Sequence, residues 1–197
     1  MRKFATAFAH SMVVLVLAGS PLHADDKVDN PLYQHWAQFK IGSFSVTKTV
    51  QTVEVAGTEM KTETTATTKL TELNAEKAVI EISTVTEVAG TEQRMPPTTM
   101  DIAAKITKTE LETQEKQKEP EGKPETKEGE EELEVAGKKV KTKWVEVTTK
   151  QGNNTIKTKS WTCEEVPGQM VKMVMTMEGE TKMRSEMTLV KFEAKKS

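Results

Sequence analysis

Period-two alternation of apolar and polar residues most restricts what this chain can fold into. From Ser43 onward, Phe44, Val46 and Val50 alternate with serine and threonine, and weaker alternation follows at 60–70, 80–82 and 100–106. Successive side chains of a strand point to opposite faces, so this pattern predicts antiparallel strands with one face in water. The 29 threonines of this 197-residue chain agree, because threonine favours strands.

A repeated hexapeptide marks the turns between the expected strands. Glu54-Val-Ala-Gly-Thr-Glu59 recurs unchanged at Glu87–Glu92, and Glu134-Val-Ala-Gly-Lys-Lys139 is a looser third copy. The copies are unevenly spaced, which excludes a regular solenoid. A glycine turn flanked by strand-forming residues explains each copy as the tip of a β-hairpin.

A short helix is expected before the first long strand. Asn30 suits the N-cap, Pro31 suits the first helical position, and Gly42 suits the end of the segment. Between them, apolar residues at helical spacing would cover one face or end of the sheet. These residues are Leu32, Trp36 and Phe39.

The first 24 residues have the pattern of a secretory signal peptide. Arg2 and Lys3 precede a short apolar run at 12–18, and Ala24 offers a small residue for cleavage. Cleavage after Ser20 is disfavoured because a proline follows. Ser20 also stands where a bacterial lipoprotein would carry its lipidated cysteine. We therefore expect an exported protein without a lipid or membrane anchor, in the periplasm or outside the cell.

The charge composition does not indicate a basic surface on this protein that would bind an acidic partner. Without the leader the chain has 26 basic and 30 acidic residues, a net charge of −4, and the interval 115–132 alone contributes four lysines and eight glutamates. The remainder is near neutral, so nucleic-acid binding through bulk charge is not expected. We expect one β-rich domain over 25–197, with β units at 43–113 and 133–195 and a mobile charged loop at 114–132.

Methionines dominate the C-terminal segment. Met173, Met175 and Met177 would share one face of a strand, and a three-residue turn at 179–181 would pair them with a second set. Three interpretations remain open: a methionine-filled core, an adaptable lining for an apolar ligand, or a soft-metal site for copper. The speculative ligand-lining residues are Met60, Met100, Met173, Met175, Met177, Met183 and Met187.

Cys163 is the single cysteine, and an exported protein rarely keeps one. It is a candidate reactive thiol or a partner for an intermolecular disulfide, and the alternative is a small buried apolar residue. Outside the leader the chain has one histidine, His35. This inventory excludes an intramolecular disulfide, a Cys/His zinc site and a multi-histidine metal centre.

Catalytic patterns are missing from the sequence. There is no GxSxG elbow, glycine-rich phosphate loop or HExxH motif, and the many glutamates fall where a solvated surface is expected. We expect no enzymatic activity and no cofactor.

The C-terminal part, residues 133–193, carries a weak family resemblance. An Ala-Gly hairpin at 135–144, a strand with Trp161, a Val166-Pro-Gly168 turn and a closing strand at 187–192 follow in that order. This order resembles uncharacterised exported all-β proteins of bacteria. More distantly, the leader, curved sheet and covering helix look like the periplasmic lipoprotein-carrier half-barrel, whose concave apolar face shields acyl chains.

The sequence thus predicts an all-β fold: a curved antiparallel sheet or half-barrel of about eight to ten strands with one short N-terminal helix. The favoured function is a non-catalytic binding module for a lipid-like or other apolar ligand. The alternative is a structural or interaction protein with a filled core that contacts another exported protein. Copper binding by the C-terminal methionines is the third hypothesis.

Overall fold

The computed structural model describes residues 27–55, 57–88, 90–118, 124–179 and 182–196. The expected signal peptide lies outside these residues. In chain order the elements are β1 (Lys27–Asp29), α1 (Pro31–Trp36), β2 (Phe44–Val55), β3 (Thr58–Leu73), β4 (Lys77–Val88), β5 (Thr91–Arg94), β6 (Thr98–Ala103), β7 (Lys105–Thr107), α2 (Lys108–Lys118), β8 (Glu125–Val135), β9 (Lys138–Gln151), β10 (Asn154–Thr162), β11 (Met170–Glu178) and β12 (Lys182–Glu193).

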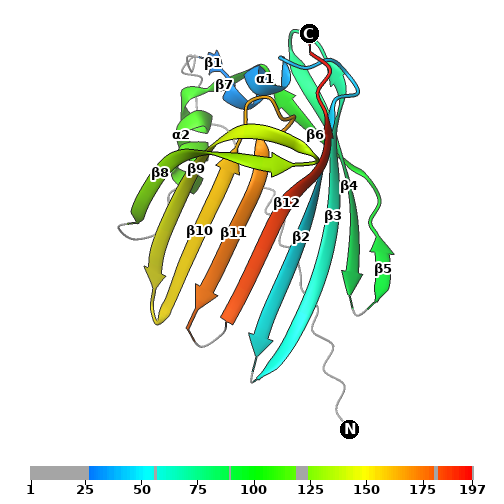
Figure 1. Ribbon diagram of the computed structural model, residues 1–197. Coiled ribbons are helices and arrows are strands. Elements are labelled where there is room, and N and C mark those ends of the chain that lie inside the picture. The colour runs from blue at the N-terminus through cyan, green and yellow to red at the C-terminus, as the bar shows by residue number, and fades with distance from the viewer. Residues whose placement is uncertain (1–26, 56, 89, 119–123, 180–181, 197) are drawn as a thin grey trace, which may run out of the picture.

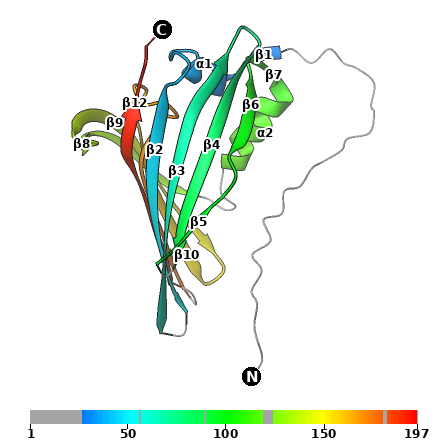
Figure 2. The same cartoon turned by 90° about the vertical axis from the view of Figure 1, so that its right-hand side faces the viewer.

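One open, curved antiparallel sheet forms most of the molecule (Figure 1 and Figure 2). Among the described residues it has ten strands in the order β5-β4-β3-β2-β12-β11-β10-β9-β8, and β6 pairs with β4 beside β5. The two predicted β units meet where β2 pairs with β12, with Val50 opposite Glu186. The predicted all-β class and the single continuous sheet are therefore confirmed. Strands β1 and β7 form a separate two-stranded sheet.

All three copies of the repeated hexapeptide lie at hairpin tips, as predicted. They connect β2 to β3, β4 to β5 and β8 to β9. Gly57 (φ 78°), Gly90 (φ 79°) and Gly137 (φ 71°) have the left-handed backbone that glycine adopts at little cost. At the third tip Ala136 also has positive φ, at 52°, so both central residues fit a type I′ turn.

The N-terminal helix forms at the predicted place. The Asn30 side-chain oxygen accepts a hydrogen bond from the Leu32 N–H, and Pro31 opens α1. The helix is shorter than predicted. It ends at Trp36, and the chain then turns through Phe39 toward β2. The rings of Trp36 and Phe39 are both buried, whereas Leu32 is 50% exposed.

The interval 114–132 differs from the predicted mobile loop. Helix α2 extends to Lys118, β8 begins at Glu125, and residues 119–123 lie outside the described part of the chain. The described residues therefore contain two helices, where one was predicted. Strand β8 lacks apolar side chains over most of its length, but its backbone pairs with β9 from Glu125↔Thr148 to Val135↔Lys138. An edge strand can form in this way because its side chains remain in water.

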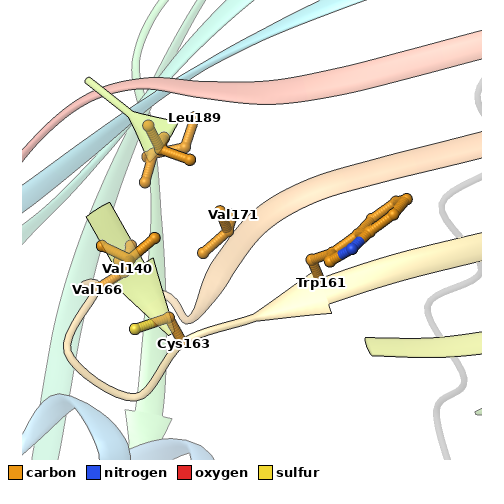
Figure 3. Packing of buried hydrophobic residues seen from close by; sticks show 7 residues of the cluster. Val140, Trp161, Cys163, Val166, Val171 and Leu189 are labelled. Atoms are coloured by element: carbon orange, nitrogen blue, oxygen red, sulfur yellow. The ribbon is translucent and has the colours of Figure 1, made fainter. Parts of the chain in front are cut away.

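Two apolar clusters stabilise the end of the sheet that is uppermost in Figure 1. One lies under α1, where helix residues pack on β3, β4 and β6; its buried members are Trp36, Phe39, Leu70, Ala78, Ile80 and Ile102. The other joins the β8–β9 hairpin to β10–β12 and the loop after β10 (Figure 3). Its buried members are Val135, Val140, Trp161, Cys163, Val166, Val171 and Leu189.

The N-cap of α1 gives a first testable prediction. Asn30 is 4% exposed, and its Nδ2 atom donates to the Ala103 carbonyl oxygen at 2.9 Å. Asn30→Ala removes both this bond and the cap, so we expect a loss of about 1–2 kcal/mol in the free energy of unfolding, measured in urea. Asn30→Ser keeps a capping oxygen and should lose less. Equal stability of the alanine variant and the wild type would contradict this role.

Candidate functional site

The methionines of β11 and β12 form directly opposed pairs. Met173 lies opposite Met187 and Met177 lies opposite Met183, with Met175 between them on the same face of β11. This register is the one predicted for a three-residue turn at 179–181. The strand pairing thus brings five of the predicted site residues onto one face of two neighbouring strands.

The same face continues across the neighbouring strands to the other two methionines. Met183 is opposite Val53 of β2, and Val53 is opposite Met60 of β3. Farther along, Ile80 of β4 pairs with Met100 of β6. Residues opposite each other in a ladder share a face, so all seven predicted methionines lie on one side of the sheet. Met60 and Met100 stand apart from the cluster on β11 and β12.

We call this side of the sheet, from β9 to β6, the Met/Thr face. The residues that make up the face carry no charge. Beyond Val145 the same side of β9 continues with Lys143, opposite Thr162, toward the β8–β9 hairpin. It comprises Val145, Val147, Thr149, Ile156, Thr158, Ser160, Val171, Met173, Met175, Met177, Met183, Ser185, Met187, Leu189, Ser45, Thr47, Thr49, Gln51, Val53, Thr58, Met60, Thr62, Thr64, Ala66, Thr68, Leu70, Ala78, Ile80, Ile82, Thr84, Thr86, Val88, Thr91, Gln93, Thr98, Met100 and Ile102.

The opposite side of the same strands carries the charges, largely as ion pairs. The Glu63 carboxylate lies 2.5 Å from Lys48 and 2.8 Å from Lys61, and hydrogen bonds from both ammonium groups lower the pKa of Glu63 to about 2. Glu186 lies 2.9 Å from Lys172, and that hydrogen bond, aided by one from a neighbouring arginine, also lowers its pKa. Charge is therefore segregated between the two sides.

The middle of the Met/Thr face lacks a tightly packed cover in the described structure. The five methionines of β11 and β12 are half-buried, Met60 is 57% exposed and Met100 is 45% exposed. None of the seven is among the buried residues that form the two apolar clusters. The methionine-filled core considered from the sequence is therefore wrong, and the open alternatives are a ligand lining and a metal site.

One end of the Met/Thr face is covered by α1 and by the loop between β10 and β11. His35 joins these two covers: its Nε2 atom lies 3.1 Å from the Val166 carbonyl oxygen and accepts from the Gly168 N–H at 3.2 Å. Its Nδ1 atom is buried without a hydrogen-bond partner among the described residues. Burial lowers the pKa of the imidazole, and the nearby Lys196 lowers it further. Only 4% of His35 is exposed.

Cys163 follows β10 in the second apolar cluster, where Figure 3 shows it beside Val140 and Val166. The residue is 7% exposed and its thiol is free. A cleft of about 450 Å³ reaches it, with three lysines and three glutamates along the walls. This placement agrees with the buried apolar alternative.

An aromatic–cation cluster on the charged side was not predicted. The Lys159 ammonium lies 4.1 Å from the centre of the Trp144 ring and 4.6 Å from that of Trp161. Glu131 of β8 accepts a hydrogen bond from the Trp161 indole N–H and lies 3.6 Å from Lys159. These contacts attach the β8 edge to the sheet. The sequence signal was the alternation that places Lys159 and Trp161 on one face of β10.

Over the described ranges, no group of three or more His, Cys, Asp or Glu side chains is arranged to hold a metal ion. Neither helix within those ranges is long and apolar enough to cross a membrane.

Comparisons with known proteins gave one weak structural similarity. A crystal structure of a DUF1329 family protein from Desulfovibrio piger matches over 80% of this chain and 88% of that chain, with 10% identity and a TM-score of 0.24. No protein-family model and no curated protein matches the chain.

The buried imidazole gives a prediction about pH. Its pKa is lowered from 6.5 in the folded protein, so the unfolded chain takes up the proton first as the pH falls. Unfolding free energy should therefore decrease from about pH 7 to pH 5, before the lowered carboxylate pKa values contribute. Urea titrations at a series of pH values measure this dependence. In His35→Gln, whose side chain offers both a donor and an acceptor, the unfolding free energy should decrease less steeply as the pH falls. The same slope in both proteins would contradict the prediction.

The position of Cys163 predicts slow reaction with a thiol reagent. Native protein should be modified only as it unfolds, because the thiol packs among buried valines, and urea-unfolded protein should react at once. Absorbance at the released chromophore follows the reaction. Rapid labelling of the folded protein would instead identify Cys163 as a reactive thiol.

Proposed function

We propose that this protein is an exported, non-catalytic binding protein that holds an acyl chain or a similar apolar molecule against the Met/Thr face. The observation that supports the proposal is the lack of charge on that face from Val145 of β9 across the sheet to β6. Covering a charged side chain with hydrocarbon costs several kcal/mol, by order of magnitude, unless the charge is paired. A surface without charges avoids this cost across most of the sheet.

The polar groups of the face are compatible with an apolar ligand. The Thr64 and Thr86 hydroxyl oxygens of neighbouring strands lie 3.4 Å apart and can share a hydrogen bond. A hydroxyl that bonds to its neighbour depends less on water, which reduces the cost of covering it. Threonine also contributes a methyl group, so such rows present apolar as well as polar atoms.

The methionines supply the adaptable part of the lining. Their unbranched side chains can change conformation to follow the shape of a ligand, and their thioethers are polarisable. The row that contains Met60, Met183 and Met177 and the next row, which contains Met175, lie toward the end of the face opposite α1. We place the hydrocarbon of the ligand over these rows, because α1 and the loop after β10 cover the other end.

A pair of charge insertions tests the proposal. Met187 lies on the Met/Thr face, whereas the next residue, Thr188, lines a groove on the charged side with Lys48 and Arg184. Met187→Lys should weaken binding of a fluorescent fatty acid by about tenfold or more, because the ammonium must be desolvated. Thr188→Lys, the matched control, should bind like the wild type.

A chain-length series separates apolar binding from recognition of a carboxylate. Each buried methylene contributes about 0.8 kcal/mol, so affinity for unbranched fatty acids should rise about tenfold for every two methylenes added. Competition against the fluorescent fatty acid measures this dependence. No binding, or affinity independent of chain length, would contradict the proposal and favour a protein-interaction role.

A further inference from the structure

The five methionines of β11 and β12 are spaced as a set of potential ligands for one ion. Directly opposed residues have Cβ atoms about 4.5–5.5 Å apart, and diagonal neighbours are about 7–8 Å apart, within reach of long side chains. Met177 and Met183 are directly opposed, and Met175 is the diagonal neighbour of Met183 on the same face. Three thioethers from these residues can therefore converge on a single point above the sheet.

The surroundings of these thioethers lack groups that would favour a hard ion. The residue opposite Met175 is Ser185, and on the adjoining strand Gln51 donates a hydrogen bond from Nε2 to the Met183 sulfur at 3.3 Å. Thioether ligands select soft ions, Cu(I) above all, whereas Mg²⁺, Ca²⁺ and Mn²⁺ require carboxylate or carbonyl oxygens. The donor set therefore indicates a soft monovalent cation.

Solvent reaches the cluster, because all five of its methionines are only half-buried. An ion in solution can therefore reach the thioethers.

We propose that Met173, Met175, Met177, Met183 and Met187 form a binding site for Cu(I), with Ag(I) as a redox-inert substitute. The ion binds as Cu(I) and exchanges its previous ligands for thioethers, so no electron is transferred. Thioethers carry no proton at neutral pH, so binding releases none. Affinity should therefore be independent of pH between about 5 and 8, unlike binding to a cysteine thiolate, which strengthens as the pH rises.

Silver titration of the full protein tests the site. Because the thiol of Cys163 is also soft, the titration is made in a Cys163→Ala background, with silver nitrate in a chloride-free buffer and isothermal calorimetry as the readout. The triple change Met175→Leu, Met177→Leu and Met183→Leu should weaken binding by about tenfold or more. The double change Met95→Leu and Met100→Leu, at exposed methionines outside the cluster, should leave it unchanged.

Leucine is close to methionine in volume and apolar character, so the triple variant should fold. Loss of silver binding in a variant that still folds would support the metal site. Silver binding that survives the triple change, or that depends on pH, would overturn the metal site and leave the acyl-binding proposal standing. Thermal melting of each variant shows whether an effect comes from unfolding.

Discussion

The antiparallel hydrogen-bond ladder determines the chemistry of both sides of the sheet. Because successive side chains alternate, a slip of one residue between β2 and β12 would carry charges onto the Met/Thr face. The register shifts within the ladder follow Leu70, Trp161 and Leu189, all members of the two apolar clusters. The irregularities thus lie where packing covers the sheet, and the open rows between β9 and β4 remain continuous.

Much of this arrangement could be predicted from the sequence because it depends on local rules. Alternation identified the strands, and glycine identified their turns, including the hairpin tip at Gly137. The spacing around 179–181 also predicted the opposition of Met177 and Met183. The sequence could not show that Met60 and Met100 reach the same side, because that depends on the pairing of strands from both halves of the chain.

The interval 114–132 shows where such reasoning fails. Its high charge indicated a loop, but backbone pairing with β9 forms β8 without any need for an apolar face. Gly129 lies within β8. In the structure a Cβ atom at this position would lie 2.7 Å from the Trp144 ring, so the absence of a side chain makes room for that ring. The buried position of His35 likewise depends on a loop more than one hundred residues away in sequence.

The edges of the sheet carry charged side chains, whereas the Met/Thr face does not, and this difference has a functional explanation. An exposed edge strand can pair with another chain, and charged side chains along it oppose such pairing. Strand β8 has that protection, since it carries glutamates along its length, and β5 at the opposite edge carries Glu92 and Arg94. The Met/Thr face has no such protection, although an exposed apolar surface promotes association. Charge thus lies at the edges of the sheet and on one side of its central strands, while the methionine-rich side has none. This distribution is expected when the methionine-rich side binds a ligand.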